Sequence, residues 1–379
     1  MEEFRMKEAI RILHVIGRMD RGGAETMLMN LYRQIDRSQI QFDFMVHTTE
    51  KGAFDDEITS LGGKIHRVPR YRGINHMSYR KSWISFFKKH KEYRIIHAHL
   101  TTTAAIFLPI AKRYNVKTIA HAHNNVPLSH GVSAIVKNVL RFPLRYIADY
   151  FFACSDAAGV RLCGKKFHKT ENCFSFYNAI DVDEFCYNPS IRESKRREMN
   201  IENKLVVGHV GRFSVVKNHN FLVEVFNQMR TKCEHAVLLL VGDGSERQRI
   251  EQKVDELGLS EHVMYLGIRQ DIDQLLQIMD IFIFPSFSEG LALAIIEAQA
   301  SGLYCLVSDG LPLEARITPL LERLSLKEGA TYWADVAIRG FKENGIRQDM
   351  TDQIKAAGYD IKETTKWLHQ FYSEVYTGI

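Results

Sequence analysis

The most informative part of the chain is an apolar run, Ile281-Phe282-Ile283-Phe284-Pro285, with a second segment close behind it, Ser288-Glu289-Gly290-Leu291-Ala292-Leu293-Ala294-Ile295-Ile296-Glu297. The apolar run predicts a buried strand that stops at its proline, and the second segment predicts a short loop and then a helix from about Leu291. Helices that begin at the carboxyl ends of parallel strands bind phosphates, because free N–H groups and the helix dipole converge there. These residues therefore predict an α/β sheet with an anion-binding site at its edge.

Two glutamates frame the predicted helix. Glu289 and Glu297 stand eight residues apart, and eight helical residues rise about 12 Å, roughly the span from the sugar ring to the ribose of a nucleotide-sugar. One carboxylate can then meet hydroxyls at each end, while the amides between them meet the diphosphate. The residues that would supply those amides are Gly290, Leu291, Ala292 and Leu293. The alternative, two glutamates on a solvated helix face, is disfavoured by the apolar residues on both sides of Glu297.

The same alternation of strands and helices continues through both halves of the chain. In the first half the strand-like runs are Ile12–Ile16, Phe42–Val46, Ile95–Ala98, Lys117–Ala120 and Tyr150–Ala153. In the second half they are Leu205–Val210, Ala236–Val241, His262–Leu266, Ile281–Phe284 and Tyr304–Val307. Alternation of this kind predicts doubly wound parallel sheets. We expect two Rossmann-like domains that face a cleft, over residues 1–185 and 186–364, with a linker around Asp183–Asn203, where Asn188, Pro189 and a charged run interrupt the pattern.

Composition limits the class of protein. The 379 residues suit two domains, and 45% hydrophobic with 25% charged residues is typical of a soluble globular chain. No apolar run approaches the roughly 18 residues of a spanning helix, and the start of the chain is too charged to lead into a secretory signal. Six scattered cysteines lack zinc-site spacing and read as reduced thiols. We expect a cytoplasmic protein.

Charge is distributed unevenly. The net charge of +5 is small for this length, so nucleic acid is not the expected partner. The stretch Lys64–Arg94, however, holds ten Lys and Arg and a single acid, Glu92, with aromatic residues interleaved. Two interpretations remain open: a solvated face over helix-core aromatics, or attraction to an anionic surface such as lipid headgroups or a polyprenyl diphosphate.

Two further loops carry candidate binding residues. In Gly211–Lys217 the guanidinium of Arg212 and the ammonium of Lys217 can converge on a diphosphate leaving group and neutralise its developing charge without a metal; the alternative is two solvated loop cations. In Gly17–Glu25 the pair Gly22 and Gly23 permits close backbone approach before a helix from about Ala24.

Histidines alternate at two predicted strand ends, in His97-Ala98-His99 and His121-Ala122-His123. Such pairs suggest zinc, but no carboxylate or cysteine completes a ligand set, so we expect no metal site.

Several of these segments together resemble retaining glycosyltransferase family 4, which has the GT-B fold. The C-terminal half carries the resemblance in Val241–Arg247, His262–Gly267, the two-glutamate segment and Ala300–Gly302, and the N-terminal half carries it in Gly22-Gly23-Ala24-Glu25. The residues after Ser308 are similar to the exopolysaccharide and capsule branch. Departures from the family pattern are Ala179, Asn218 and Ala292, where glycine (or proline, at residue 292) is common.

The resemblance assigns roles to individual residues. It implies that Arg212 and Lys217 stabilise the departing diphosphate and that His123 contacts the sugar. It also implies that Gly22 and Gly23 line the donor or acceptor cleft and that residues 365–379 form a helix packed on the first, acceptor-side domain. For His97, His99 and His121 packing or cleft lining is expected, and no essential metal is expected.

The resulting hypothesis is a retaining transferase that moves a hexosyl unit from a UDP-sugar, less readily a GDP-sugar, to a lipid-linked surface-polysaccharide precursor. It would act at the inner face of the plasma membrane, through weak peripheral association of the Lys64–Arg94 stretch. A nucleotide-sugar 2-epimerase would need further acid and base carboxylates in the first domain. A non-catalytic nucleotide-sugar-binding or scaffold subunit of a polysaccharide assembly complex is the alternative from another class, and the intact Arg212, Lys217, Glu289 and Glu297 argue against it.

Overall fold

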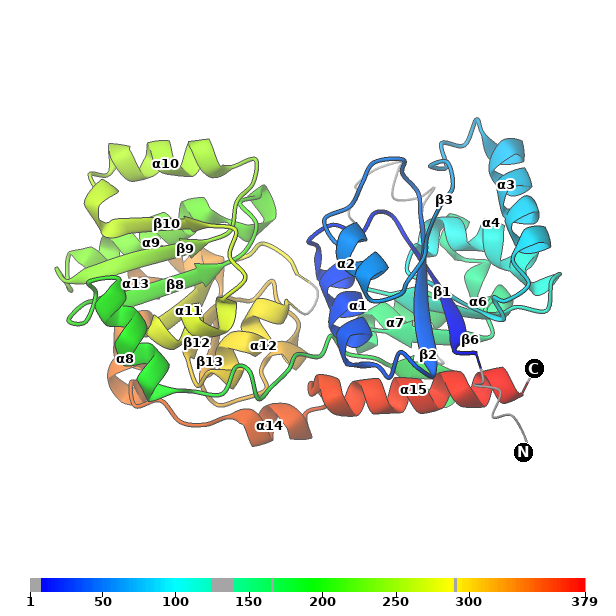
Figure 1. Cartoon of the computed structure of the whole chain (residues 1–379). Coiled ribbons are helices and arrows are strands. Elements are labelled where there is room, and N and C mark those ends of the chain that lie inside the picture. Colours follow the sequence, from blue (N-terminus) through cyan, green and yellow to red (C-terminus); the bar gives the residue numbers. More distant parts are fainter. Residues whose placement is uncertain (1–7, 124–138, 165–166, 290–291, 379) are drawn as a thin grey trace. The chain divides into compact units, whose positions relative to one another are not determined.

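The computed structural model describes residues 8–123, 139–164, 167–289 and 292–378. The chain divides into two compact units (Figure 1): the first comprises residues 1–179 together with 361–379, and the second comprises residues 180–360. The predicted boundaries, after residues 185 and 364, lie a few residues further along the chain. Each unit contains one parallel sheet.

The first unit is built on a seven-stranded sheet in the order β3-β2-β1-β4-β5-β6-β7. Its strands are β1 (Ile10–Ile16), β2 (Ile40–Val46), β3 (Ile65–Arg67), β4 (Ile95–Ala98), β5 (Lys117–Ala122), β6 (Tyr150–Ala153) and β7 (Cys173–Ser175). Alternate residues of β1 enter different cores: Ile12 and Ile16 join one cluster, and Leu13 and Val15 join another. Apolar side chains on both faces are what a parallel sheet covered by helices on both sides requires.

Helices cover both faces of this sheet. They are α1 (Gly23–Gln34), α2 (Asp55–Ser60), α3 (His76–Lys89), α4 (Thr101–Lys112), α6 (Leu144–Ile147), α7 (Asp156–Cys163) and α15 (Ile361–Thr377). Residues of α1 and α15 pack in the same core cluster, while α3, α4 and α6 contribute to the other. The last helix therefore belongs to the first unit, with Leu368, Tyr372 and Val375 buried in its core.

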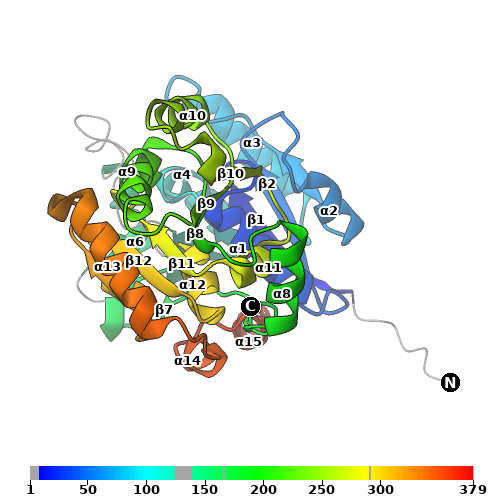
Figure 2. The same cartoon turned by 90° about the vertical axis from the view of Figure 1, so that its left-hand side faces the viewer.

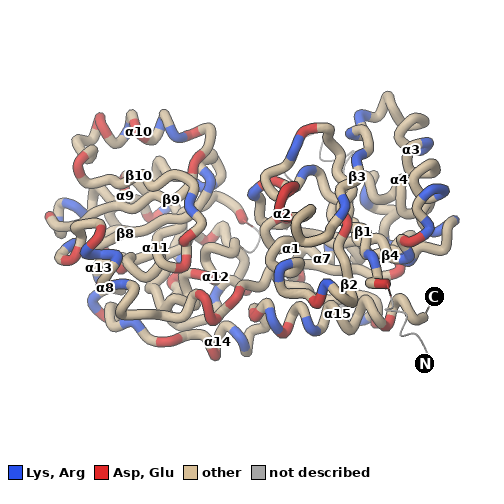
Figure 3. The backbone as a smooth tube through the Cα atoms, in the orientation of Figure 1, with Lys and Arg blue, Asp and Glu red and all other residues tan. Residues whose placement is uncertain are grey.

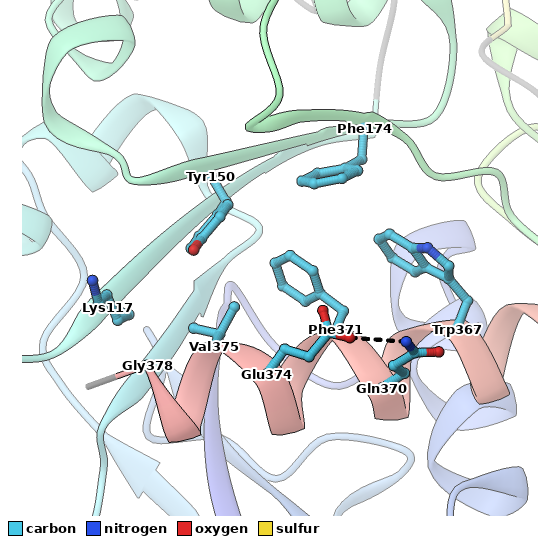
Figure 4. A pocket seen from close by; sticks show the side chains of 9 residues that line it. All are labelled: Lys117, Tyr150, Phe174, Trp367, Gln370, Phe371, Glu374, Val375 and Gly378. Carbon is cyan, nitrogen blue, oxygen red and sulfur yellow. Dashed lines mark hydrogen bonds between the residues drawn. The ribbon is translucent and has the colours of Figure 1, made fainter.

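A pocket of about 330 Å³ lies where α15 crosses the sheet (Figure 4). Its lining includes Lys117 and Tyr150, the first residues of β5 and β6, and Trp367 and Phe371 of α15. The pocket thus opens at the amino ends of the strands, and none of the predicted site residues lines it.

The second unit repeats the plan with a six-stranded sheet in the order β10-β9-β8-β11-β12-β13. Its strands are β8 (Leu205–Val210), β9 (Ala236–Val241), β10 (Val263–Gly267), β11 (Ile281–Phe284), β12 (Tyr304–Ser308) and β13 (Leu321–Leu324). Its helices are α8 (Pro189–Glu198), α9 (His219–Arg230), α10 (Arg247–Glu256), α11 (Ile272–Ile278), α12 (Leu293–Ala300), α13 (Gly329–Asn344) and α14 (Thr351–Ala356). Figure 2 shows α9 and α13 on one side of this sheet and α8 and α11 on the other.

The predicted linker is wrong in its central part, because residues 189–198 form the helix α8. Asn188 caps this helix by accepting hydrogen bonds from the backbone amides of Ser190 and Ile191, and Pro189 occupies its first turn. Arg196 is buried and donates to Asp280, in a network shared with Arg192. The charged run that suggested a solvated linker is instead held against the second unit by ion pairs.

Candidate active site

The loop after β8 carries two of the predicted cations. Arg212 is exposed and makes no hydrogen bond or ion pair with the other residues that the structure describes. Lys217 ends a short 3₁₀ turn, Val215–Lys217, directly before α9. The next residue, Asn218, adopts a left-handed conformation with φ of 56°, and its side-chain amide donates to the carbonyl of Pro285. Asparagine tolerates this conformation better than most residues, so the loop keeps the backbone geometry that a glycine would give.

Lys217 lies against the end of β11. Its ammonium is 2.9 Å from a carboxylate oxygen of Glu289, and both side chains are 17% exposed. The same ammonium stands 4.3 Å from the ring centroid of Phe284, a cation–π arrangement. The structure thus brings together Lys217, predicted to meet the diphosphate, and Glu289, predicted to meet hydroxyls at one end of the donor.

Glycines let the neighbouring loops approach this point. A Cβ at Gly242, whose φ is +132°, would collide with the carbonyl of Gly211, and one at Gly244 would collide with the carbonyl of Phe213. Phe213 N–H also donates to the carbonyl of Asp243 over 3.0 Å. The turn after β9, which contains Asp243, therefore supports the Arg212 loop through its backbone.

The helix α12 begins at Leu293, with Ala292 as its N-cap and no side-chain cap. Gly290 and Leu291, which were also predicted to bind the donor, lie outside the described residues. The first-turn amides of a helix without a side-chain cap are available to an anion.

Glu297 lies in the middle of α12, between buried apolar residues. Burial, and to a lesser extent the negative charge of Glu184, raises the pKa of its carboxyl to about 7. Glu297 forms no ion pair with another residue that the structure describes. A carboxyl group of this kind, half protonated near neutrality, is suited to a ligand that brings hydrogen-bond donors.

In the first unit, the predicted glycines form the start of α1. Gly22 is its N-cap, where a Cβ would collide with the carboxylate of Glu25, and Gly23 is its first residue, with nothing within 4 Å of the position that a Cβ would take. Gly23 therefore leaves backbone open to an approaching molecule, whereas Gly22 makes room for the side chain of Glu25.

Five histidines gather at the carboxyl ends of neighbouring strands in the same unit. The parallel register explains why they meet. His14 of β1 pairs with His97 of β4. His99 and His123 stand two residues beyond His97 and His121, so each pair lies on one face of the sheet. The ring centroids of His121 and His123 are 4.0 Å apart, and those of His97 and His99 are 4.5 Å apart. Four of these histidines were predicted to lie at strand ends. His14 was not predicted, although it lies beside His97 in the register of β1 and β4.

Two triplets of this cluster bring ring nitrogens within 4.8 Å of one another: His14, His97 and His99, and His99, His121 and His123. The nitrogens that face inward already bond to each other, with His99 Nδ1 at 2.7 Å from His123 Nε2 and His97 Nε2 at 3.2 Å from His121 Nδ1. Burial lowers the pKa of all five rings, which therefore stay neutral. Neutral imidazoles bind metal ions, but here hydrogen bonding among the rings accounts for the packing.

Comparison with known proteins shows which family the chain resembles. Residues 21–184 match the description Glycosyltransferase Family 4, and residues 191–355 match Glycosyl transferases group 1. The putative glycosyltransferase EpsF of Bacillus subtilis is 32% identical over 370 residues, which cover 96% of each chain. The capsular polysaccharide biosynthesis glycosyltransferase CapH of Staphylococcus aureus is 26% identical over 303 residues, which cover 76% of this chain and 79% of CapH.

Among solved structures, HepE of Anabaena in complex with UDP superposes with a TM-score of 0.78 at 19% identity, over 96% of this chain and all of HepE. This likeness supports the two-sheet fold. On the strength of the matches along nearly its whole length, the chain belongs to the retaining glycosyltransferases of family 4.

Proposed function

We propose that this glycosyltransferase moves a hexosyl unit from a UDP-sugar to a lipid-linked saccharide precursor of a surface polysaccharide. The observation that carries the proposal is the Lys217–Glu289 ion pair at the end of β11, directly before the uncapped start of α12. A cation, a carboxylate and free helix amides are the groups that a sugar diphosphate requires.

The proposed roles follow the chemistry of each group. Glu297 accepts hydrogen bonds from the ribose hydroxyls, and Glu289 accepts them from the sugar. Arg212 and Lys217 stabilise the diphosphate as it departs, helped by amides of Ala292 and Leu293. Because the charge on the leaving oxygens grows in the transition state, these cations contribute more to turnover than to binding.

In the first unit, His123 and Gly23 line the reacting face, and Gly22 shapes the turn before α1. His123 lies at the carboxyl end of β5 and Gly23 at the start of α1. These are the positions in an α/β unit where ligands bind.

Uracil as the base of the donor is supported by relatives. The solved HepE structures hold UDP and, in one case, UDP-glucose. An Escherichia coli relative, 26% identical over 71% of this chain, is named as a galactosyltransferase that uses UDP-Gal and a diphosphoundecaprenol-linked acceptor. The name of CapH, a glycosyltransferase of capsular polysaccharide biosynthesis, supports a surface polysaccharide as the product.

The Lys64–Arg94 stretch is proposed to attract the anionic membrane that carries the acceptor. In the structure Tyr79, Trp83 and Phe87 are buried against the first unit, so its aromatic residues are helix core. Its cations lie along β3, the following loop and α3 (Figure 3), where Ile74 and Met77 are also exposed, by 96% and 66%. Two exposed apolar side chains among cations suit shallow contact with lipid headgroups. Among the described residues, no helix is long and apolar enough to cross a bilayer.

The test is a panel of UDP- and GDP-sugars, followed by thermal shift and by donor hydrolysis. We expect one UDP-sugar to raise the unfolding temperature and to be hydrolysed slowly, and Glu289→Ala to abolish hydrolysis while UDP still binds. Preference for a GDP-sugar would refute the assignment of the base. Binding of a nucleotide-sugar without hydrolysis or transfer to any acceptor would refute the proposed reaction.

A further inference from the structure

The histidine cluster of the first unit contains a continuous hydrogen-bonded chain that ends at His123. His14 Nδ1 lies 3.1 Å from His99 Nε2, and His99 Nδ1 lies 2.7 Å from His123 Nε2. His99 therefore uses both of its ring nitrogens within the chain.

Each ring in this chain carries a single proton. Burial lowers the pKa of His14 to about 3, that of His123 to about 4 and that of His99 well below its ordinary value. A neutral imidazole donates from one nitrogen and accepts at the other. Once the proton of one ring is placed, the hydrogen bonds place the other two.

Only two proton arrangements satisfy both hydrogen bonds. In the first, His14 Nδ1–H donates to His99, His99 Nδ1–H donates to His123, and His123 carries its proton on Nδ1. In the second, every donor is reversed: His123 Nε2–H donates to His99, His99 Nε2–H donates to His14, and His14 carries its proton on Nε2. His123 Nδ1 is thus a hydrogen-bond donor in one arrangement and an acceptor in the other.

The far end of the chain distinguishes the two arrangements. His14 Nε2 is buried and has no hydrogen-bond partner among the described residues. Its ring packs against Phe42, Phe44 and Tyr372, with centroids 4.2, 5.7 and 6.3 Å away. Orphaned buried N–H groups are rarer than under-satisfied acceptors, so this apolar surrounding accommodates a bare nitrogen at lower cost than an N–H.

The surroundings of His123, at the other end of this hydrogen-bonded chain, favour the same proton arrangement. His123 Nδ1 also lacks a partner among the described residues, but it stands at the carboxyl edge of the sheet, where the proposed donor would lie. A ligand oxygen there can accept from an N–H, whereas His14 Nε2 has no acceptor among the residues that the structure describes.

We propose that His99 and His14 are positioning residues that hold His123 in the tautomer protonated on Nδ1. His123 then donates a hydrogen bond to a hydroxyl or phosphate oxygen of the nucleotide-sugar and does not act as a base. The identity of that ligand rests on the proposed function; the tautomer does not, because it can be measured without a ligand.

A second chain in the same cluster supplies a matched control. Tyr372 Oη lies 2.7 Å from His97 Nδ1, and His97 Nε2 lies 3.2 Å from His121 Nδ1. It is as deeply buried as the first chain and shares no hydrogen bond with it among the described residues. Tyr372→Phe removes one hydroxyl from this chain and leaves the His14–His99–His123 chain intact.

The first experiment reads the tautomer directly. The ring nitrogens of the full-length protein, labelled with ¹⁵N-histidine and assigned with a His123→Gln variant, should show His123 with protonated Nδ1 and bare Nε2 at neutral pH. Finding the proton on Nε2 would overturn the proposal. So would stoichiometric zinc in the purified protein, because a metal would then bind the inward nitrogens.

The second experiment separates hydrogen bonding from packing. His99→Asn and His99→Leu are nearly isosteric, but only asparagine can donate to His123 Nε2. With a donor sugar that the wild type hydrolyses, we expect Leu to lower kcat at least tenfold, and Asn and Tyr372→Phe to stay within about threefold of wild type.

Equal losses for Asn and Leu would show that His99 only fills space and would refute its positioning role. If the wild type hydrolyses no nucleotide-sugar, the proposed function fails, while the ¹⁵N measurement still decides the tautomer.

Discussion

At the scale of single residues, Glu297 is the group whose surroundings most directly predict a pH effect. Its pKa in the folded protein is raised from 4.5 to about 7, so the folded state binds more protons than the unfolded state between these values. Stability in the absence of ligand should therefore fall as pH rises from about 4.5 to 7. Ribose hydroxyls favour the ionised form, so UDP affinity should rise over the same range and continue to rise to about pH 8.

The measurement is calorimetric titration with UDP at pH 6 and pH 8, for the wild type and for Glu297→Gln. Glutamine accepts hydrogen bonds but does not ionise, so it removes the contribution of Glu297 and keeps that of the diphosphate itself. Loss of a hydrogen bond to a charged group costs about 1.5–3 kcal/mol, so the variant should bind UDP roughly tenfold or more weakly at pH 8. The same pH dependence in both proteins would exclude Glu297 from the nucleotide site.

Lys217 makes a second prediction at this scale. Because its ammonium pairs with Glu289 in the free protein, Lys217→Ala removes the cation and also releases the carboxylate. We expect kcat to fall by a factor of a hundred or more and UDP affinity by much less, since the charge it meets grows during departure of the diphosphate. Lys217→Arg is the control, because it keeps the charge. A larger loss in UDP affinity than in kcat for the alanine variant would contradict this role.

At the scale of elements, the loops around β8 and β9 depend on backbone contact. Gly242→Ala forces a residue with a Cβ into φ of +132° and against the carbonyl of Gly211. We expect a cost of roughly 1–3 kcal/mol in unfolding free energy, together with weaker UDP binding as the Arg212 loop shifts. Gly258→Ala is the control: its φ is also positive, at +67°, but nothing lies within 4 Å of its Cβ. Equal effects of both variants on UDP binding would show that the collision does not move the loop.

The elements also show what sequence alone predicts. The ten predicted strands are all present, because buried parallel strands are continuous apolar runs. The short strands β3, β7 and β13 were missed, since polar or charged residues interrupt their three or four positions. The helix α8 was mistaken for a linker because its sequence is rich in charged residues. Only the structure shows that Arg196 of this helix forms an ion pair with Asp280.

Two features of the candidate site could not be predicted from the sequence. The loop sequence alone predicted Arg212 and Lys217 as binding cations. The pairing of Lys217 with Glu289 could not be predicted, because it depends on two separate segments that meet at one edge of the sheet. His14 was missed for the same reason: a single histidine in an apolar strand looks like packing until the register with β4 places it beside His97.

At the scale of the whole molecule, the first prediction concerns metal. The proposed site neutralises the leaving diphosphate with Arg212, Lys217 and helix amides, so activity should not require a divalent ion. Transfer rates measured in EDTA and in Mg²⁺ or Mn²⁺ should agree within about twofold. Activity that is abolished by EDTA and restored by Mn²⁺ would show that a metal ion is needed to neutralise the diphosphate.

The last prediction concerns the membrane. Each exposed cation near an anionic leaflet contributes about 1 kcal/mol, and salt screens the attraction. The cations of α3 are Arg80, Lys81, Lys88 and Lys89. We expect the protein to sediment with vesicles that contain phosphatidylglycerol at low salt, and to be released as salt approaches about 0.5 M. Changing these four residues to glutamate should abolish that binding.

A second quadruple variant, with the same change in net charge, tests whether net charge alone explains the vesicle binding. It replaces four exposed cations outside the Lys64–Arg94 stretch by glutamate: Arg249, Lys327, Lys342 and Lys366. If the α3 face contacts lipid, only the first variant loses vesicle binding, and Ile74→Ser with Met77→Ser should weaken the binding that remains at intermediate salt. Equal loss in both quadruple variants would mean that net charge alone attracts the vesicles, and the α3 face would then be a solvated surface.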